Sequence, residues 1–461
     1  MPFSASISHL PEILGIAAPV APISPSSTIA GINTDTRTLQ PGEVFLALQG
    51  ETFDGHRFLE AAVEKGAKAL IISRPPDRPL PDAIPQFLVK DTLRAYQKIG
   101  NWWRDRFDIP IIGITGSVGK TTTKELISAV LGTKGKVLKT QKNYNNEIGV
   151  PKTLLELSEN DDYAVIEMAM RGTGQIAELT EIARPTIGII TNVGTAHIGL
   201  LGSREAIARA KCELLATMPK DSIAILNADN ELLMKTAAEV WQGETISYGL
   251  EKGDLRGEMR DRQTLRVEGQ DFPLPLLGSH NASNYLAALA VAKVLEVDWQ
   301  PLRSGLSVEL PKGRAKRYDL KGNVTLLDET YNAGFESMVA ALKLLKETPA
   351  QRHIAVLGTM KELGEKSAEL HQKVGETAKE LGLDRVIILT DDRQAEAIAI
   401  GSQGIPTVCV TTHDEVVSVL REDVRSGDCL LFKASNSVGL SRVVEQFKAE
   451  WKAEFNKKNE S

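Results

Sequence analysis

The feature that most constrains this fold is a glycine-rich turn, Gly116-Ser117-Val118-Gly119-Lys120-Thr121, which lies between two patterned segments. Residues 109–114 form an apolar run that predicts a buried strand, and residues 121–131 have helical periodicity. Glycines let consecutive backbone N–H groups point inward around an oxyanion, and the N-terminus of the following helix adds partial positive charge. The sequence therefore predicts a phosphate loop between a strand and a helix.

The spacing of this loop departs from the general pattern GxxxxGK[ST], which would place the first glycine at position 114, where this chain has Ile. A glycine turn with an exposed lysine is the alternative interpretation of so short a motif. If the loop binds a nucleotide, Lys120 can reach the β- and γ-phosphates and the Thr121 hydroxyl can ligate Mg²⁺.

The chain has 461 residues, and domains typically contain about 100–200, so several are expected. We expect an N-terminal domain over 1–107, a central domain over 108–310 and a C-terminal domain over 311–461. In the central domain, strands at 163–167, 186–191 and 222–227 alternate with helical segments, which indicates a mainly parallel sheet covered on both faces. Residues 245–276 are expected to form an antiparallel edge, before a helix at 281–295.

In the outer domains, predicted strands also alternate with predicted helices, so the expected fold class is α/β throughout. The expected strands lie at 44–48 and 69–72 in the first domain and at 324–328, 353–358, 385–389 and 429–432 in the third. The expected helices lie at 58–65 and 92–107, with a loop at 74–85. Only the tail 457–461 is expected to be disordered.

Composition excludes several classes of protein. The formal net charge of −6 gives no global basic field for nucleic acid or an anionic membrane. Three sparse cysteines argue against a disulfide framework, and no apolar run reaches the about 18–20 residues of a membrane span. The N-terminal stretch has neither the basic flank nor the apolar segment of a secretory signal. We expect a soluble cytoplasmic protein, and a monomer because no coiled-coil heptads are present.

Polar residues follow several predicted strands of the central domain. Glu167 ends one strand, His197 follows the next, and Asn227 and Asp229 follow a third. Ligands bind outside the carboxyl ends of parallel strands, so these side chains are expected beside the phosphate loop, where Glu167 and His197 could ligate Mg²⁺. A helix cap or a hydrogen-bonded loop residue is the alternative for each one, and for Lys211 it is a solvated helix position.

Longer motifs resemble the Mur ligase family over nearly the whole chain. They comprise residues 115–125, 143–151, 192–213, 280–284, 313–314 and 328–333, and residues 35–56 resemble the UDP-binding domain of that family. Residues 120–125, 331–333 and 357–364 are most similar to the branch that adds D-alanyl-D-alanine to a UDP-N-acetylmuramoyl tripeptide. The resemblance implies ATP-dependent amide bond formation through an acyl phosphate, in peptidoglycan precursor synthesis.

The resemblance also implies a role for each matching residue. Lys120, Glu167, His197 and Lys211 would be catalytic, with Lys211 carbamylated, and Mg²⁺ would be bound by Thr121, Glu167 and His197. ATP would be bound by Thr115, Gly116, Ser117, Val118, Gly119, Lys120, Thr121, Asn281, Asn284, Arg314 and Asp328. The UDP-sugar peptide and the dipeptide would be bound by Thr36, Arg37, Asn143, Asn145, Asn146, Glu147, Tyr331 and Asn332.

The chain departs from the family pattern in its third domain. Thr359 stands where the family usually has Asp, Gly334 where it has Asn, and residues 433–436 read Lys-Ala-Ser-Asn instead of Lys-Gly-Ser-Arg. A sister Mur ligase that adds a single amino acid stays open as an alternative, although residues 390–393 do not match the Asp-Asn-Pro-Arg motif of the diaminopimelate-adding branch. A folylpolyglutamate synthase-like ligase and a nucleotide-binding protein without turnover stay open as well.

Overall fold

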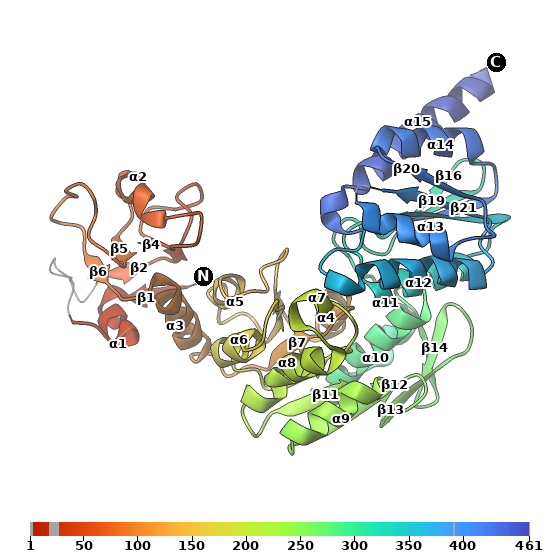
Figure 1. The fold of residues 1–461 in the computed structure, drawn as a ribbon. Coiled ribbons are helices and arrows are strands. Elements are labelled where there is room, and N and C mark those ends of the chain that lie inside the picture. Colours follow the sequence, from red (N-terminus) through yellow and green to blue (C-terminus); the bar gives the residue numbers. More distant parts are fainter. Residues whose placement is uncertain (1–2, 18–26, 391, 461) are drawn as a thin grey trace.

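The computed structural model describes residues 3–17, 27–390 and 392–460. Within these ranges the chain forms three α/β units in sequence order, and Figure 1 shows the first unit at the left, the central unit below and the third unit at the upper right. None of the helices in these ranges combines the length and the apolar character that a membrane span requires. The three-unit α/β architecture predicted from the sequence is confirmed.

The first unit is built on a parallel sheet with strand order β3-β4-β5-β6, preceded by an antiparallel pair of β1 and β2. Its strands are β1 (Ala5–Ser6), β2 (Thr28–Ile29), β3 (Ile32–Asn33), β4 (Val44–Leu46), β5 (Ala69–Ile72) and β6 (Gln86–Leu88). Its helices are α1 (Leu10–Leu14), α2 (Leu59–Glu64) and α3 (Thr92–Arg104), with the 3₁₀ helices η1 (Ile7–His9) and η2 (Gly55–Phe58). Asp91 caps α3 by accepting hydrogen bonds from the backbone N–H groups of Leu93 and Arg94. This helix packs on α5 and α6 and so joins the first unit to the central one.

The central sheet has the order β15-β14-β13-β12-β11-β10-β7-β9-β8. Its strands are β7 (Ile111–Thr115), β8 (Val137–Lys139), β9 (Tyr163–Glu167), β10 (Ile187–Ile190), β11 (Ile223–Asn227), β12 (Thr245–Gly249), β13 (Leu255–Met259), β14 (Thr264–Val267) and β15 (Gln270–Pro273). Its helices are α4 (Lys120–Leu131), α5 (Gly149–Leu154), α6 (Gln175–Ala183), α7 (Ile198–Leu201), α8 (Arg204–Thr217), α9 (Glu231–Val240), α10 (Ser279–Val294) and the 3₁₀ helix η3 (Gln300–Ser304). The prediction of an antiparallel edge over 245–276 is wrong for β12 and right from β13 onward. β12 pairs parallel with β11, and antiparallel pairing begins between β13 and β14.

Successive side chains of a buried strand point to opposite faces of the sheet, so the core of the central unit has two layers. Ile112 and Ile114 of β7 face a layer that includes residues of α4 and α10, whereas Ile111 faces residues of α6 and α8. The expected parallel sheet covered on both faces is therefore present. Strand order changes direction at β7, because β9 and β8 lie on one side of it and β10 to β12 lie on the other. Such a switch point opens a crevice at the carboxyl end of the strand, where the glycine turn lies.

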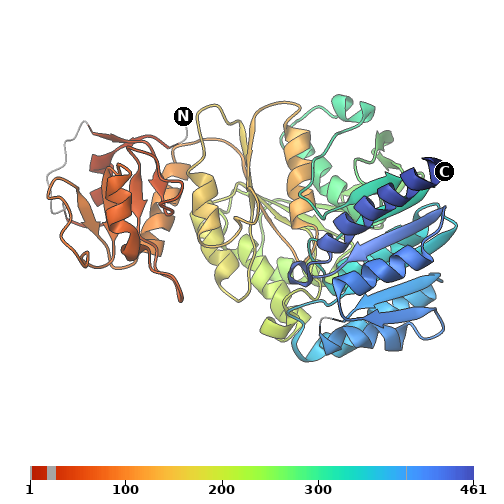
Figure 2. The ribbon, with the colours of Figure 1, turned by 90° about the horizontal axis from the view of Figure 1, so that it is seen from above.

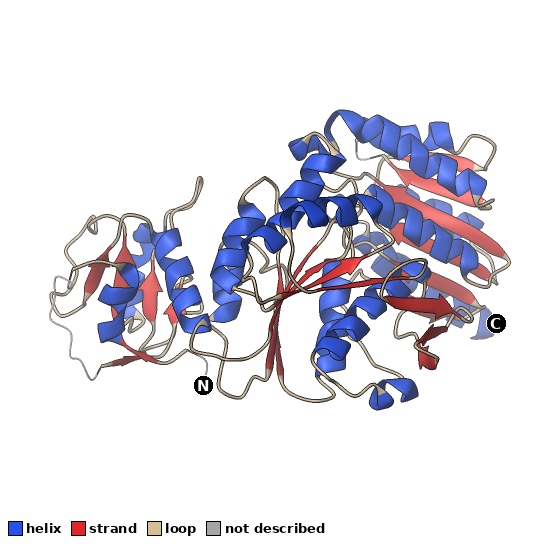
Figure 3. Ribbon diagram, turned by 90° about the horizontal axis from the view of Figure 1, so that it is seen from below, coloured by secondary structure: helices blue, strands red, loops and turns tan. Residues whose placement is uncertain are grey.

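The third unit has the sheet order β16-β17-β21-β18-β19-β20, in which only β16 among the described strands is antiparallel to its neighbour. Its strands are β16 (Lys316–Leu320), β17 (Val324–Asp328), β18 (Arg352–Gly358), β19 (Arg385–Leu389), β20 (Thr407–Val410) and β21 (Asp428–Lys433). Its helices are α11 (Phe335–Glu347), α12 (Ser367–Glu380), α13 (Ala397–Gly401), α14 (His413–Asp423) and α15 (Ser441–Glu460), with the 3₁₀ helices η4 (Gly364–Lys366), η5 (Arg393–Glu396) and η6 (Asn436–Val438). Figure 3 shows the helices of this unit on both sides of its strands. Helix α15 continues to Glu460, so the expectation of a disordered tail is wrong for 457–460, and Ser461 lies outside the described residues.

In the central and third sheets, the three strands that the sequence did not predict all lie at sheet edges. β8 ends the central sheet, and β16 and β20 end the third sheet. Their side chains are mostly half-buried or exposed, because an edge strand is covered less completely. They therefore lack the continuous apolar run that marks a central strand of a parallel sheet.

Candidate active site

The predicted phosphate loop connects β7 to α4. Gly116 and Gly119 have φ values of 151° and 85°, in a region that side-chain-bearing residues rarely adopt. Gly119 is the residue that precedes the first turn of α4. The glycines therefore allow the reversal that points the loop at the N-terminus of the helix, where backbone N–H groups are free to bind an anion.

Asn192, which lies two residues after β10, holds the phosphate loop in place through three hydrogen bonds. Its backbone carbonyl accepts from Ser117 N (3.1 Å), and its side chain both accepts from Val118 N (3.0 Å) and donates to Val118 O (2.9 Å). Gly194 N donates to Ser117 Oγ at 2.9 Å. The phosphate loop and the loop that begins at Asn192 therefore form one hydrogen-bonded unit.

Lys120 points back over the loop, and its ammonium donates to Gly116 O at 2.8 Å. Burial lowers the pKa of Lys120, the carboxylate of Glu167 opposes that shift, and the cation of Arg314 adds to it. A lysine in this position can move from the carbonyl to a phosphate oxygen without leaving the cleft.

Glu167 lies at the carboxyl end of β9 and is 3% exposed. Its Oε1 accepts from Asn145 Nδ2 at 2.8 Å, and its Oε2 lies 3.9 Å from Lys124 Nζ. Oε2 has no hydrogen-bond partner among the described residues, although it is buried. A buried carboxylate oxygen with spare acceptor capacity beside a phosphate loop is suited to a divalent cation.

His197 has a left-handed backbone (φ 65°) and directly precedes α7 as its N-cap residue. Its Nδ1 lies 2.6 Å from Glu362 Oε2, a side chain of the third unit. Burial lowers the pKa of His197, which the carboxylate of Glu362 counteracts. The imidazole is thus oriented by a residue 165 positions further along the chain.

Lys211 lies on α8 and is only 2% exposed, which excludes the alternative of a solvated helix lysine. Burial lowers the pKa of Lys211 well below its ordinary value, and the nearby cation of Lys120 adds to the shift. No ion pair to Lys211 is present in the part of the chain that the structure describes. A buried, uncompensated amine favours its neutral form, which is the form that reacts with carbon dioxide to give a carbamate.

The third unit contributes the opposite wall of the site. The Arg314 guanidinium carbon lies 3.9 Å from the centre of the Tyr331 ring, and Arg314 Nε is buried without a hydrogen-bond partner among the described residues. Asp328, at the end of β17, accepts from the backbone and the hydroxyl of Thr330 at 3.1 and 2.6 Å. Arg314 therefore presents unsatisfied donor capacity close to Lys120.

These residues enclose a cleft of about 780 Å³ between the central and third units. The predicted residues that line it are Ser117, Val118, Gly119, Lys120, Thr121, Asn143, Asn145, Glu167, His197, Asn281, Asn284, Arg314, Tyr331 and Asn332. Figure 2 shows the two units packed together, with the first unit on the far side of the central one. The cleft therefore brings most of the predicted site into one space.

Some predicted residues lie outside the cleft lining. They are Thr36, Arg37, Thr115, Gly116, Asn146, Glu147, Lys211 and Asp328. Arg37 belongs to the first unit, where it pairs with Asp35 at 2.7 Å. Asn146 accepts from Gly149 N at 2.9 Å and so shapes the turn into α5. Lys211, Thr115 and Asp328 are buried behind the surface of the site.

The donor set fits a Mg²⁺ ion that is held partly by substrate. Among the described residues, no cluster of three His, Cys, Asp or Glu side chains could hold a metal by itself. Mg²⁺ usually keeps several waters and takes one or two carboxylates together with phosphates. The unpartnered Oε2 of Glu167 and the hydroxyl of Thr121 on the cleft surface meet this requirement.

Sequence reasoning did not assign roles to Lys433 and Glu329, which also line the cleft. Lys433 is 3% exposed and donates to Asn332 O at 2.9 Å, and its ammonium lies 3.9 Å from Glu329 Oε2. Burial lowers the pKa of Lys433 and raises that of Glu329. Both residues lie at the carboxyl ends of strands, so the rule that identified Glu167 would have identified them in the third sheet too.

The positions that depart from the family pattern have different surroundings. Thr359 is fully buried, and its carbonyl accepts from Ser435 N at 3.0 Å. A Cβ at Gly334 would have open space around it, whereas the Ala434 methyl packs against Gly358. Asn436 lines the cleft. Of these positions, Gly334 and Asn436 line the cleft, and Asn436 is the one whose side chain could contact a ligand there.

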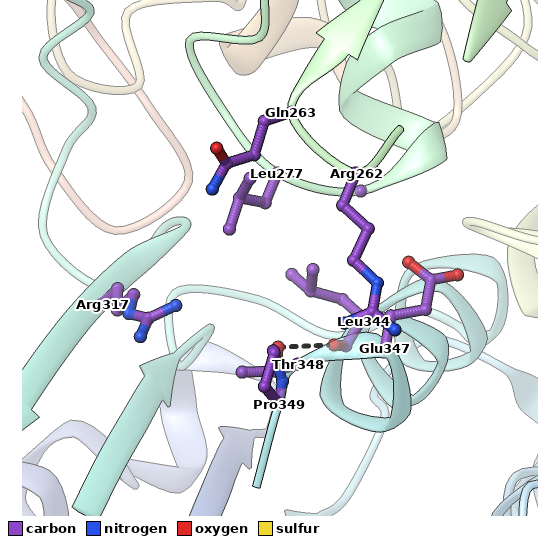
Figure 4. A pocket seen from close by; sticks show the side chains of 9 residues that line it. Arg262, Gln263, Leu277, Arg317, Leu344, Glu347, Thr348 and Pro349 are labelled. Atoms are coloured by element: carbon purple, nitrogen blue, oxygen red, sulfur yellow. Dashed lines mark hydrogen bonds between the residues drawn. The ribbon is translucent and has the colours of Figure 1, made fainter. Parts of the chain in front are cut away.

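A second cavity of about 290 Å³ lies between the central unit and the end of α11 (Figure 4). Its lining residues are Arg262, Gln263, Leu277, Gly278, Arg317, Leu344, Glu347, Thr348 and Pro349. Thr348 Oγ1 donates to Leu344 O at 2.7 Å, the bond drawn in Figure 4. None of the predicted site residues lines this cavity.

Comparison with known proteins identifies the family of this chain. Residues 114–292 match the model "Mur ligase middle domain", residues 313–436 match "Mur ligase, glutamate ligase domain", and residues 28–95 match "Mur ligase family, catalytic domain". The chain belongs to the Mur ligase family. The resemblance inferred from the sequence motifs is thereby confirmed.

Individual Mur ligases of one branch are similar over nearly the full length. The UDP-N-acetylmuramoyl-tripeptide--D-alanyl-D-alanine ligase of Synechocystis is 59% identical over 431 residues, which cover 94% of each chain. The crystal structure of MurF from Acinetobacter baumannii has a TM-score of 0.87 at 29% identity and covers 97% of this chain and 99% of its own. MurF from Thermotoga maritima, solved in complex with ADP, has a TM-score of 0.82 at 31% identity, with 92% and 98% covered. The predicted similarity to the D-alanyl-D-alanine-adding branch is confirmed.

Proposed function

We propose that this Mur ligase joins D-alanyl-D-alanine to UDP-N-acetylmuramoyl tripeptide, with ATP as co-substrate, as a monomer in the cytoplasmic part of peptidoglycan precursor synthesis. The observation that carries the proposal is the single cleft in which Lys120 and Glu167 of the central unit face Arg314 and Tyr331 of the third. The Synechocystis relative, whose name states these substrates, supports the choice of acceptor and dipeptide.

ATP is assigned to the phosphate-loop end of the cleft. The backbone N–H groups of residues 116–121 and the ammonium of Lys120 bind the phosphates, which burial makes favourable because the surroundings have a low dielectric. Asn281 and Asn284 on α10 and Arg314 contact the rest of the nucleotide, and Asp328 lies towards its ribose. The proximity of Asn284 to the loop supports this placement, since a Cβ on Gly119 would lie 2.6 Å from Asn284 Oδ1.

Mg²⁺ is assigned to Glu167, His197 and the Thr121 hydroxyl, together with phosphate oxygens. When bound, the ion offsets negative charge between the phosphates and an incoming carboxylate. Lys211 is assigned as a carbamate, because the carbamate oxygens could ligate a cation whereas a bare ammonium would repel it. The low pKa that burial imposes on Lys211 supports this modification.

The acceptor peptide carboxylate must be activated, since a carboxylate does not react with an amine at neutral pH. The γ-phosphoryl group passes from ATP to this carboxylate to give an acyl phosphate, and Lys120 neutralises charge on the transferred group. The dipeptide amine then attacks the carbonyl carbon, the C–N bond forms while the bond from carbon to the phosphate oxygen breaks, the nitrogen loses a proton, and inorganic phosphate leaves. The two walls of the cleft keep water away from the acyl phosphate.

The remaining substrate groups are assigned along the chain. Thr36 and Arg37 bind the UDP moiety in the N-terminal domain (1–107). The loop residues Asn143, Asn145, Asn146 and Glu147 of the central domain (108–310) line the path of the muramoyl peptide. Tyr331 and Asn332 of the C-terminal domain (311–461) receive the dipeptide, near the buried pair of Lys433 and Glu329.

The deciding experiment measures ADP release with UDP-N-acetylmuramoyl tripeptide as acceptor. D-alanyl-D-alanine is compared with single amino acids, and folate acceptors are tested in parallel. Release that depends on the dipeptide is the expected result. Release with a single amino acid would identify a sister Mur ligase, release with a folate would identify a folate ligase, and binding of ATP without turnover would reject the enzyme assignment.

Two substitutions test the assigned residues. Lys120→Ala should abolish dipeptide-dependent ADP release, while the matched control Lys235→Ala, on the exposed face of α9, should keep full activity. Lys211→Ala should lose activity that bicarbonate cannot restore, and short carboxylic acids should restore part of it by supplying the missing oxygens. Normal turnover in either active-site variant would refute the corresponding role.

A further inference from the structure

Glu336 reaches from the third unit across the cleft to the loop that follows β10. It is the second residue of α11, and its Oε1 accepts from Thr195 N at 2.7 Å while its Oε2 accepts from the Thr195 hydroxyl at 3.1 Å. Both carboxylate oxygens are therefore bonded to one residue of the central unit. Thr195 is 8% exposed and Glu336 is half-buried at the cleft surface, so these hydrogen bonds are partly shielded from water.

Gly194 leaves the space in which this carboxylate lies. A Cβ at this position would be 2.5 Å from the carboxyl carbon of Glu336 and 2.7 Å from its Oε1. The φ of Gly194 is outside the left-handed region, so the backbone there does not require glycine. The absence of a side chain is thus explained by the approach of Glu336 rather than by the conformation of the loop.

A second contact between the same loop and the third unit lies a few residues further on. Gly199 N donates to Glu362 O at 3.2 Å, and a Cβ on Gly199 would lie 2.5 Å from Gly364 N. The Glu362 carboxylate also meets His197 Nδ1. The segment 194–199 is therefore held by the third unit on both sides of His197.

The other end of this segment is bonded to the phosphate loop. Gly194 N donates to Ser117 Oγ, and Asn192 bonds to Ser117 and Val118 through its backbone and its side chain. Hydrogen bonds thus connect Glu336 to Thr195 and Gly194 to the phosphate loop, and the peptide bond between Gly194 and Thr195 joins the two contacts.

We propose that Glu336 is a positioning residue that couples docking of the third unit to the arrangement of the phosphate loop and His197. Its carboxylate fixes Thr195 only when the third unit lies against the central unit, so the loop reaches its catalytic position together with Arg314 and Tyr331. This inference rests on the proposed function and adds to it a residue of the cleft lining that acts through Thr195.

The first test compares Glu336→Ala and Glu336→Gln in the full chain, with Glu347→Ala as matched control. Glu347 is the exposed last residue of the same helix, and Figure 4 shows it at the end of α11. Loss of hydrogen bonds to a charged group costs enough to lower kcat by about 10- to 100-fold in Glu336→Ala. KM for the UDP-sugar peptide should change less than kcat, because Glu336 acts through Thr195 and the loop and not through a contact with that substrate.

Glu336→Gln should stay within about threefold of wild type, because an amide oxygen still accepts from Thr195 N–H and its NH₂ group can donate to the hydroxyl. Wild-type turnover in Glu336→Ala would overturn the proposal. Equal losses in the Ala and Gln variants would also overturn it, since hydrogen bonding would then not be what the residue supplies.

The second test uses the close approach at Gly194. Gly194→Ala places a methyl group against the Glu336 carboxylate and should lower kcat about tenfold or more, whereas in the Glu336→Ala background the same change should cost less than about twofold. Equal costs in the two backgrounds would overturn the proposal. Thermal unfolding of each variant shows whether the fold is intact.

Failure of the proposed function is separated from failure of this inference by small-angle X-ray scattering. A non-hydrolysable ATP analogue with Mg²⁺ should keep wild type compact, whatever the acceptor substrate is, and Glu336→Ala should have a larger radius of gyration under the same conditions. If wild type shows no dipeptide-dependent ADP release but this difference is found, the coupling stands and the substrate assignment fails. Equal radii for both proteins would overturn the coupling.

Discussion

Replacing Lys124 by methionine should destabilise the central unit far more than replacing Lys139, although both ammonium groups pair with Glu125. Lys124 is 1% exposed, and its Nζ lies 3.1 Å from Glu125 Oε1 and donates to Thr140 O at 2.7 Å. It is also the cation nearest the unpartnered oxygen of Glu167, at 3.9 Å. Lys139 Nζ lies 2.5 Å from Glu125 Oε2, but its side chain is 33% exposed.

Burial, not distance, decides the expected magnitude. Removing one member of a buried ion pair leaves an uncompensated charge and costs about 3–5 kcal/mol. Lys124→Met removes the cation 3.9 Å from Glu167 Oε2 and the side-chain donor to Thr140 O, so the upper part of this range is expected. A partly exposed pair contributes about 1 kcal/mol or less, because water and salt screen it. Lys139→Met should therefore cost no more than about 1 kcal/mol.

The measurement is native-state hydrogen exchange on peptides that cover α4 and β9, since a three-unit chain need not unfold in one step. A loss of 3–5 kcal/mol corresponds to exchange about 150- to 5,000-fold faster, and 1 kcal/mol to about fivefold. Peptides of the third unit serve as an internal control and should not change. Equal acceleration by the two substitutions would refute the reasoning that burial sets the value of these pairs.

Two further predictions concern acid stability and backbone packing. Burial alone would raise the pKa of Asp54, but hydrogen bonds, first from the backbone N–H of His56, lower this pKa to about 2. The resulting stabilisation is present above about pH 4 and is lost as pH falls towards 2. An acid titration of unfolding should therefore depend less on pH in Asp54→Asn than in wild type, and an unchanged profile would contradict the assignment. Gly149→Ala would place a Cβ against the backbone of Tyr144, which cannot rotate away, and should lower the free energy of opening of the central unit by about 3 kcal/mol or more. Gly172→Ala, with open space around it, should change this free energy, measured by the same hydrogen exchange, by less than about 1 kcal/mol. Similar values for both substitutions would show that the Tyr144 loop yields.

Local sequence was enough to predict the phosphate loop and the strand-end residues of the central sheet. A buried strand of a parallel sheet is a continuous apolar run, and β7, β9 and β11 show it clearly. Because parallel strands end at one edge, Glu167 and His197 could be placed near the loop from their order alone. Edge strands such as β8 and β20 lack this pattern and were missed.

Long-range contacts were beyond such reasoning. Lys211 and Lys124 are helix residues whose burial depends on what packs over them, and nothing in their own segments distinguishes them from solvated lysines. Glu336 and Thr195 are 141 positions apart, so their contact exists only because the third unit docks at this angle. The same holds for His197 and Glu362.

The sequence by itself determined that this chain folds as α/β units and that the glycine-rich loop from Gly116 to Thr121 joins a strand to a helix, because those outcomes depend on backbone conformation and on apolar periodicity. The tertiary structure decided which charges are buried, which carboxylate oxygen is left unpartnered and which residues of the third unit hold the loop around His197. Those properties arise from desolvation and from contacts between distant segments, and neither is encoded in any single stretch of the chain.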